Sequence, residues 1–419
     1  MVQAVRGMRD VLPQEARRWR VVEDAITQIL RSYAYEEVQL PLLEFTDLFA
    51  RGVGEATDIV EKEMYSLNDR DGDSLSLRPE GTASCVRALL EHGLLFNQTQ
   101  RVFYTGPMFR YEKPQKGRYR QFSQVGAEAF GFQGPDLDLE LLLMCDEFWR
   151  ALRVRDHVTL EINTIGAKDS RTAYRAALVE YLTPLEDQLD EDSRRRLQTN
   201  PMRILDSKIE STQALLNDAP DMQDFLGEDS KANFAELCEM LDSHGVEYVV
   251  NPRLVRGLDY YTDTVFEWTT TALGAQGTVC AGGRYDGLVE QLGGRPTPAA
   301  GFGLGVDRAV LLHEQVHQDQ LRSNVDVYVC FAQQSMMRAA NEVARDLRSN
   351  DLRVRVHMGG GNFKKQLKRA DGSGATWAVI IGEEEIATDS VTVKNLKTGD
   401  QRSVTNAELS GQIREDGSS

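Results

Sequence analysis

Residues 103–131, FYTGPMFRYEKPQKGRYRQFSQVGAEAFG, decide the fold of this chain. The stretch predicts two β-strands joined by a loop, with Arg110 near the end of the first strand. Because successive side chains of a strand point to opposite faces, Gln124, Gly126 and Glu128 share one face of the second strand. A fixed arginine and a carboxylate beside small residues indicate a site for a polar organic substrate.

The loop between these strands is strongly basic. It holds four cations together with a proline and a glycine as turn-forming residues, namely Lys113, Pro114, Lys116, Gly117, Arg118 and Arg120. A cationic loop next to a fixed arginine indicates that the substrate is accompanied by a polyphosphate. The alternative is a solvated loop beside the wet face that antiparallel sheets often have.

Composition limits the class of protein. The 419 residues, 41% hydrophobic and 27% charged, predict a globular protein of two to three domains. The sequence contains no apolar run of 18 residues and no signal-peptide core, so we expect no membrane partner. Its five scattered cysteines form no CxxC pair, which favours the reducing cytoplasm and gives no reason to assign a metal site.

The formal net charge of −17 argues against a surface coated by nucleic acid. A structured RNA partner is still compatible, because phosphate binding requires only a local basic surface. Two such clusters occur, the loop 113–120 and the group Lys364, Lys365, Lys368 and Arg369. The second lies on a predicted helix, 362–371, for which an ordinary solvated face is the alternative interpretation.

The apolar pattern divides the chain into two predicted domains. Residues 1–320 are predicted to form an α+β domain on an antiparallel sheet, and residues 325–419 a smaller α/β domain. A polar linker is predicted at 317–324. Residues 167–247 are charged, helical and broken by prolines, so they are predicted to be a helical insertion between two halves of the sheet.

A second unusual stretch is LVRGLDYYTDTVFEW, residues 254–268, which is predicted to lie in a strand from 255 to 269. Arg256, Asp259, Tyr260 and Tyr261 crowd into it. A buried strand does not normally carry so many polar groups, so they indicate a ligand site. A structural ion pair between Arg256 and Asp259 is the alternative.

Two glycine-rich stretches follow. AGGRYDGLVEQLGG, residues 281–294, predicts a strand and a turn whose glycines allow close backbone approach to a ligand. AAGFGLGVDRAVLLHE, residues 299–314, predicts a strand of small residues suited to a flat ring, with Arg308 in the first turn of the next helix. The latter has neither GxGxxG spacing nor the GK[ST] of a P-loop.

These stretches resemble the signature motifs of class II aminoacyl-tRNA synthetases, and specifically of the histidyl-tRNA synthetase family. Residues 38–45, 103–131 and 299–314 resemble the three class motifs, and 254–268 and 281–294 the two histidine motifs. Further matches extend the resemblance over nearly the whole chain: GMRDVLP at 7–13, LRPEGT at 77–82, TNPMRILDSK at 199–208 and GGGNFKKQLKRAD at 359–371.

The resemblance implies a class II synthetase fold with a C-terminal anticodon-binding domain. It implies a ligase that joins L-histidine to ATP as histidyl-adenylate, releases pyrophosphate, and transfers histidine to the 3′ end of tRNA(His). Mg²⁺ is expected on the ATP phosphates. A homodimer is expected through residues 38–45.

The resemblance also implies a role for each candidate residue. Arg110 and Arg256 are expected to act on the α-phosphate, since arginine is always charged and can bind two oxygens. Arg118 and Arg308, with Arg110, are expected to bind ATP. The histidine-binding set contains carboxylates, hydroxyls and one amide: Glu80, Thr82 and Gln124 for the ammonium, Glu128 and Tyr261 for the imidazole, and Tyr260.

Three alternatives differ in what they require. A synthetase-like regulatory subunit of histidine biosynthesis is expected to lack the C-terminal domain and the intact histidine motifs. A sensor fused to a kinase requires a kinase glycine loop and an HRD triplet, which the sequence does not contain. A class II synthetase for another amino acid is disfavoured by residues 254–268.

Overall fold

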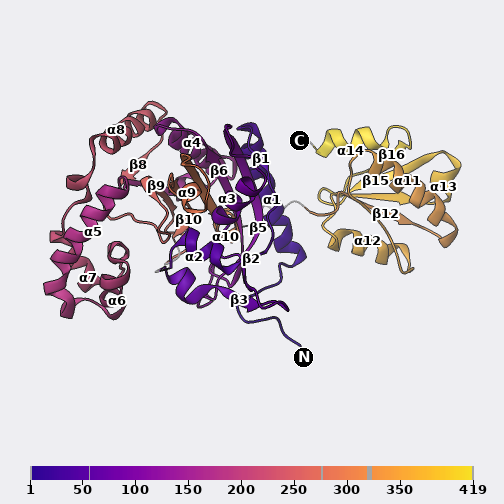
Figure 1. The fold of residues 1–419 in the computed structure, drawn as a ribbon. Helices are drawn as coiled ribbons and strands as arrows, with labels where there is room; N and C mark the ends of the chain where they lie inside the picture. The colour runs from indigo at the N-terminus through magenta and orange to yellow at the C-terminus, as the bar shows by residue number, and fades with distance from the viewer. Residues whose placement is uncertain (1, 56, 275–276, 319–322, 418–419) are drawn as a thin grey trace. The chain divides into compact units, whose positions relative to one another are not determined.

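The computed structural model describes residues 2–55, 57–274, 277–318 and 323–417, in two compact units, 1–318 and 319–419 (Figure 1). The first unit is built on an eight-stranded sheet. Its strands, in spatial order, are β1 (Glu36–Glu37), β5 (Gln100–Phe109), β6 (Gln121–Phe130), β11 (Ala299–Gly305), β10 (Thr278–Arg284), β9 (Thr262–Thr269), β7 (Thr159–Thr164) and β8 (Tyr248–Val250). Only the edge pairs β1–β5 and β7–β8 are parallel, which confirms the antiparallel prediction.

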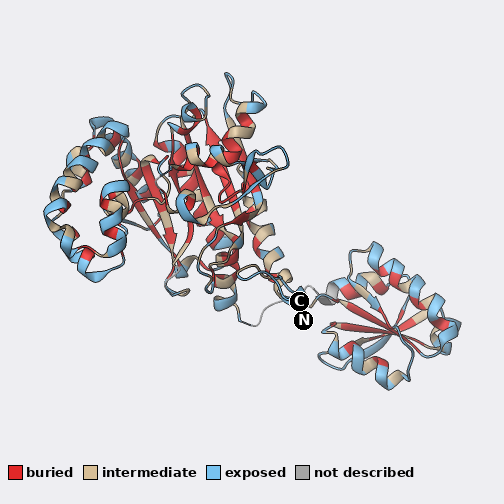
Figure 2. Ribbon diagram, turned by 60° about the horizontal axis from the view of Figure 1, so that its bottom comes forward, coloured by how far each residue is buried: buried red, intermediate tan, exposed pale blue. Residues whose placement is uncertain are grey.

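Helices cover one face of this sheet and form its main hydrophobic core. They are α1 (Pro13–Ser32), α4 (Pro135–Ala151), α8 (Glu228–Ser243) and α10 (Val306–Val316). Val125, Ala127 and Ala129 of β6 point into this core, and the alternate residues of β6 point to the opposite face. Figure 2 shows the buried residues concentrated along the strands. The opposite face carries α3 (Thr82–Glu91), α9 (Leu288–Gln291) and the functional pocket.

A small antiparallel sheet lies apart from the large one. It consists of β2 (Leu43–Phe45), β4 (Ser74–Leu77) and β3 (Tyr65–Asn68), followed or flanked by α2 (Thr46–Val53) and the π-helix η1 (Ile59–Glu63). Of the predicted extended segment 38–45, only the part after Pro41 and Leu42 forms a strand of this sheet. Arg78 fixes the earlier part, because its guanidinium donates to the carbonyls of Leu40 and Pro107.

The predicted helical insertion lies between β7 and β8. Its elements are α5 (Lys168–Leu182), η3 (Thr183–Gln188), α6 (Glu191–Thr199), η4 (Pro201–Ile204), α7 (Glu210–Leu215), η5 (Leu216–Asp218), η6 (Met222–Phe225) and α8. In Figure 1, α5, α6 and α7 form a lobe beside the β8–β9 side of the sheet. The last helix, α8, packs instead on the main core through Leu237 and Leu241. It therefore belongs to the layer of helices that covers the large sheet.

The predicted strand 255–269 is partly wrong. β9 begins only at Thr262, and residues 254–261 form an irregular loop. The carbonyls of Gly257, Asp259 and Tyr261 accept hydrogen bonds from arginine side chains rather than from a neighbouring strand. Residues before Thr262 therefore do not join the ladder.

The second unit contains a five-stranded mixed sheet. Its spatial order is β13 (Val354–Val356), β12 (Val327–Phe331), β14 (Trp377–Ile381), β15 (Ser390–Asn395) and β16 (Gln401–Thr405). α11 (Met337–Ser349), preceded by η7 (Gln334–Met336), and α14 (Leu409–Gly417) pack on one side and α12 (Phe363–Gly372) on the other. The strands and helices match the predicted α/β domain, and α12 matches the helix predicted at 362–371, while α13 (Glu383–Ala387) lies between β14 and β15.

The predicted linker, 317–324, falls largely on residues 319–322, which lie outside the described part of the chain. Across the described ranges, the helices are too short or too polar for any of them to cross a bilayer.

Candidate active site

A pocket opens where β6, β10 and β11 meet the loop 254–261 and the hairpin loop. Nine of the ten candidate residues line it: Glu80, Thr82, Arg110, Arg118, Gln124, Arg256, Tyr260, Tyr261 and Arg308. These residues come from six separate parts of the sequence, and the fold brings them together around one pocket. The tenth candidate, Glu128, lies behind the pocket wall and is fully buried.

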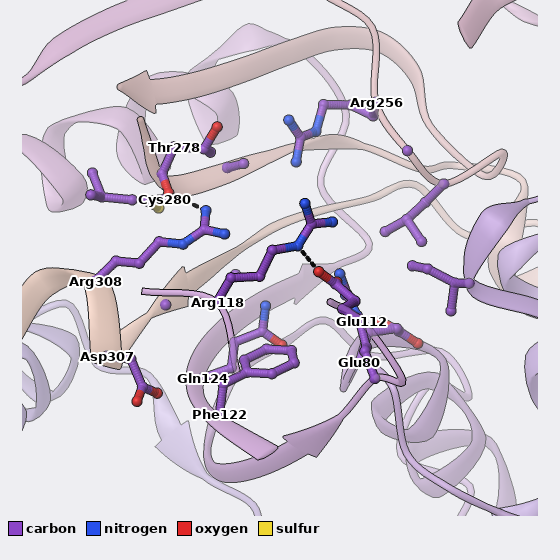
Figure 3. A pocket seen from close by; sticks show the side chains of 18 of the residues that line it. Glu80, Glu112, Arg118, Phe122, Gln124, Arg256, Thr278, Cys280, Asp307 and Arg308 are labelled. Atoms are coloured by element: carbon purple, nitrogen blue, oxygen red, sulfur yellow. Dashed lines mark hydrogen bonds and ion pairs between the residues drawn. The ribbon is translucent and has the colours of Figure 1, made fainter. Parts of the chain in front are cut away.

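Arginine side chains converge on the cavity. Figure 3 shows Arg118, Arg256 and Arg308 pointing into it from three directions. Arg308 donates from Nε to the Gly117 carbonyl at 3.0 Å and from Nη1 to the Thr278 carbonyl at 2.5 Å. Burial, reinforced by the charges of Arg118 and Arg110, lowers the pKa of Arg308 to about 10. The guanidinium still carries its charge at neutral pH, and crowding of like charges favours an anionic ligand.

Arg110 is fixed at the end of β5. Its Nε donates to the Pro79 carbonyl at 2.8 Å, and its guanidinium lies 5.4 Å from the centre of the Phe122 ring. Arg118, from the hairpin loop, forms an ion pair with Glu112 (Figure 3). This ion pair joins the two sides of the cationic loop.

Arg256 has a partner that the sequence did not indicate. Its Nη1 donates to Glu267 Oε1 at 2.8 Å, and Thr278 Oγ1 donates to the same oxygen at 2.8 Å. The alternative of an Arg256–Asp259 ion pair is wrong, because the Asp259 carboxylate accepts instead from Asn200. The buried Nε of Arg256 has no hydrogen-bond partner among the described residues, which leaves a donor for a ligand.

Glu128 is surrounded by hydroxyl groups. Its Oε1 accepts from Thr82 Oγ1 at 2.8 Å and from the Tyr104 hydroxyl at 3.0 Å, and its Oε2 accepts from the Tyr285 hydroxyl. Burial raises the pKa of Glu128 to about 8, although all three hydroxyls favour the ionised form. Tyr104 and Tyr285 were not predicted. Tyr285 lies within the quoted stretch 281–294, and Tyr104 shares the pocket face of the hairpin.

Several glycines predicted to face a ligand instead make room for protein side chains. A Cβ on Gly126 would lie 2.2 Å from Cζ of Tyr104, and one on Gly301 would lie 1.9 Å from Oε2 of Glu128. A Cβ on Gly282 would lie 2.2 Å from the Gly301 carbonyl, so that position allows two strands to approach closely. Gly305 has no such neighbour within 3.8 Å and lines the open pocket.

Glu80 caps the helix that leads away from the pocket. Its carboxylate accepts from the backbone N–H groups of Thr82 at 2.7 Å and Ala83 at 2.9 Å. Burial is the main cause of its raised pKa. The rings of Tyr260 and Tyr261 are tilted by 47° with centroids 4.7 Å apart, and both contact Tyr285, which completes an aromatic wall.

Gln124 lines the pocket and carries an acceptor that no described protein group uses. Its Oε1 is buried and has no hydrogen-bond partner among the described residues. It lies on the pocket face of β6 opposite Gly305 of β11, as the alternation of the strand predicts.

The pocket residues do not by themselves form a metal site. In the described ranges, no group of three or more His, Cys, Asp or Glu residues is arranged to hold a metal ion. Each carboxylate that lines the pocket already has a protein partner: Glu80 accepts from backbone N–H groups, Glu112 forms an ion pair with Arg118, and Asp307 accepts from Arg9 and the Ser123 N–H.

Comparisons with known proteins identify a family for each of the two units. The family model for histidyl-tRNA synthetase matches residues 7–309, and the model for an anticodon binding domain matches residues 326–416. The chain is similar to the solved apo histidyl-tRNA synthetase of S. aureus, with 35% identity and a TM-score of 0.81, covering 99% of this chain and 100% of that chain.

Two more distant structures support the fold alone. The histidyl-tRNA synthetase of Nostoc sp. PCC 7120 is 19% identical, with a TM-score of 0.74 and 99% coverage of both chains. A Bacillus halodurans protein described as an ATP phosphoribosyltransferase regulatory subunit/histidyl-tRNA synthetase is 24% identical, with a TM-score of 0.64 and coverage of 91% of this chain and 97% of that chain.

Proposed function

The chain belongs to the histidyl-tRNA synthetase family, whose members are histidine–tRNA ligases, and on that premise we propose how its pocket handles the substrates. Histidine, ATP and tRNA are the substrates of this family. The histidine carboxylate attacks the α-phosphate of ATP and expels pyrophosphate, and the histidyl group then passes to the 3′ end of the tRNA. The first step needs no strong base, because the attacking carboxylate is already ionised.

The convergence of arginines on one cavity carries the proposal. Two anions must meet in line, and negative charge must be neutralised in the transition state. Arg110, anchored on Pro79, holds the α-phosphate together with the histidine carboxylate. Arg256 binds the α-phosphate from the other side, using the Nε donor that lacks a protein partner. Arg118 and Arg308 hold the pyrophosphate end of ATP.

The ammonium of histidine is assigned to the acceptors at the start of α3 and on β6. Gln124 offers the unpartnered Oε1, and Thr82 and Glu80 line the same side of the pocket. Glu80 is already oriented by the helix terminus, so it adds negative charge without needing to move.

The imidazole is assigned to Glu128, Tyr260 and Tyr261. Histidine is proposed to bind to ionised Glu128, whose carboxylate has about four lone-pair sites, three of them occupied by hydroxyls. One site on Oε2 remains for an imidazole N–H. Tyr261 supplies a hydroxyl for the second ring nitrogen, and Tyr260 packs beside it. A site built to satisfy both nitrogens rejects amino acids that lack them.

Mg²⁺ is proposed to enter with ATP. Because the pocket carboxylates accept from protein donors, the ion would be held mainly by phosphate oxygens and would supply charge neutralisation there.

A homodimer is proposed through the small three-stranded sheet. Leu42, Leu43, Phe45 and Leu67 are each more than two-fifths exposed on it or at its edge. A cluster of exposed large apolar side chains marks a protein interface, and the position agrees with the dimer motif expected at 38–45.

The second unit is proposed to bind the anticodon of tRNA(His). Four exposed cations lie on or beside α12: Lys364, Lys365, Lys368 and Arg369. Single-stranded bases are read by their edges and by stacking, with phosphate contacts that weaken as salt rises. We also place the enzyme in the cytoplasm, where its five free cysteines would stay reduced.

ATP–pyrophosphate exchange with each of the twenty amino acids tests the activity. Only histidine should support exchange. A chain ending at Asn324 should still form histidyl-adenylate, because the pocket lies wholly in the first unit, while its charging of tRNA falls steeply. Equal charging by the folded, dimeric truncated chain would contradict the role of the second unit.

A further inference from the structure

The loop 254–261 is held by the helical insertion. Its carbonyls at Gly257, Asp259 and Tyr261 accept from guanidinium groups of that insertion. Arg203 Nη1 donates to Gly257 at 3.5 Å, and Arg171 Nη1 donates to Asp259 at 3.1 Å and also to Tyr261. Backbone carbonyls outside a regular ladder bond to other donors, and at these three positions the arginines take the place of a neighbouring strand.

A side-chain contact adds a second connection. Asn200, between α6 and η4, donates from Nδ2 to Asp259 Oδ1 at 2.7 Å. The same aspartate donates its backbone N–H to the Val53 carbonyl at 3.1 Å, and its side chain fills the space beside Gly54. Asp259 is therefore held between the insertion and the end of α2.

The insertion is itself fixed to the body of the first unit near this point. Asp58, before η1, accepts from Arg196 at 3.0 Å and lies 3.7 Å from Arg203 and 3.6 Å from Arg195. One carboxylate thus binds the same segment of the insertion that contacts the loop. The insertion is therefore held against the first unit by these ion pairs as well as by its covalent connections to β7 and β8.

The pocket side of this loop presents Arg256, Tyr260 and Tyr261 to the cavity. We propose that Asn200 and Arg171 are positioning residues for histidine activation, because they hold the loop that places these three side chains. The proposal rests on the roles assigned to Arg256 and Tyr261 under the proposed function. It gives the motif at 199–208 a task in the first reaction step.

Loss of these contacts should change kinetics more than folding. Asn200→Ala should lower kcat/KM for histidine in ATP–pyrophosphate exchange by about 10-fold, and Arg171→Ala by about 10²-fold, as expected when reactive groups are misplaced by about 1 Å. The loss should appear in kcat as well as in the KM for histidine. Asn217→Ala is the matched control. Asn217 lies in the same insertion, but its side chain accepts from Arg253, which precedes the loop 254–261.

A pair of variants that swaps the two side chains, and so keeps the net charge, separates an effect on positioning from an effect on folding. Asn200→Asp alone places two carboxylates together and should slow exchange, while adding Asp259→Asn restores a hydrogen bond of reversed direction and should recover most of the rate. Recovery supports the proposal. Unchanged exchange in Asn200→Ala, or loss in the single variant without recovery in the double variant, overturns it.

Arg256→Ala is run in parallel. If it slows exchange while folded Asn200→Ala and Arg171→Ala do not, only the positioning inference fails. If Arg256→Ala leaves exchange unchanged, the assignment of the pocket residues fails first.

Discussion

Two walls of the pocket are built in different ways. The strand wall consists of residues of β5, β6 and β11, with Gln124 lining the pocket and Glu128 directly behind it, and the backbones of these strands bond to neighbouring strands over seven to ten consecutive pairs. The loop wall consists of residues 254–261, whose carbonyls bond to side chains from 54 to 90 residues away. In the strand wall, regular backbone hydrogen bonds fix which face each side chain points to. The loop wall has no such ladder, and its shape depends on side chains from another part of the chain.

Removal of Arg256 is the most severe test of the loop wall. Arg256→Ala should slow histidine activation by about 10²–10³-fold, as for the loss of one transition-state donor. Folding should change little, because the residue is only partly buried and its partner Glu267 keeps the hydroxyl of Thr278. Single-turnover adenylate formation and the melting temperature measure the two effects. A folded variant with a near-normal rate would remove Arg256 from the reaction.

Removal of Glu128 is the corresponding test of the strand wall. Glu128→Ala should raise the KM for histidine and lower kcat/KM by about 10–100-fold, since removing one partner of a buried hydrogen bond costs about 1–3 kcal/mol. ATP affinity should change less, because Glu128 lies behind the wall and away from the arginines. Separate titration of the two substrates distinguishes these effects. Loss of ATP affinity with normal histidine affinity would assign the residue another task.

The rigidity of the strand wall can be tested without replacing a polar side chain. Gly126→Ala places a methyl group against the ring of Tyr104 and should lower the free energy of unfolding by about 1–3 kcal/mol. Gly287→Ala is the control, because no atom lies within 4 Å of its added Cβ. Urea unfolding measures both. Equal free energies of unfolding for the two variants would mean that the strand wall shifts to accommodate the added methyl group as easily as a loop does.

A smaller effect concerns pH. The pKa of Glu128 is raised to about 8 in the folded chain from an ordinary 4.5, so between these values the folded protein holds a proton that the unfolded chain has released. Stability contributed by this group therefore falls as pH rises through that window. Glu128→Gln removes the titration.

The stability of Glu128→Gln relative to the parent should increase by about 1 kcal/mol between pH 6 and pH 7. Glu236→Gln, at an exposed position of α8, should show no such trend. A constant difference for Glu128→Gln across pH 5–9 would show that the carboxylate stays ionised, and that the strand wall tolerates a buried charge.

The strand wall was largely predictable from sequence. Alternation along the second strand of the hairpin correctly separated the core-facing residues from Gln124, Gly126 and Glu128, and the strand and the following helix predicted within 299–314 are present as β11 and α10. What alternation could not reveal is which protein group occupies the space above a glycine. Gly126 and Gly301 therefore suggested ligand contacts, although Tyr104 and Glu128 fill those positions.

The loop wall was not predictable in the same way. LVRGLDYY alternates enough to resemble a strand, and nothing local reveals that Arg171 and Arg203 will bind its carbonyls. The pairing of Arg256 with Glu267 was missed for a related reason: the nearest acid in sequence, Asp259, points to Asn200. Long-range side-chain contacts decide this region, and they leave no periodic pattern in the sequence.

The Tyr104 ring lies between two glycines, since a Cβ on Gly81 would come within 2.1 Å of its Cε2 and one on Gly126 within 2.2 Å of its Cζ. For the evolution of the pocket, these three positions form one unit of change. A methyl group at either glycine collides with the ring, and a smaller residue at Tyr104 leaves a void and removes one hydroxyl from Glu128. A single substitution at any of the three positions is therefore destabilising, so a change of amino-acid preference that begins here costs stability unless the three residues change together.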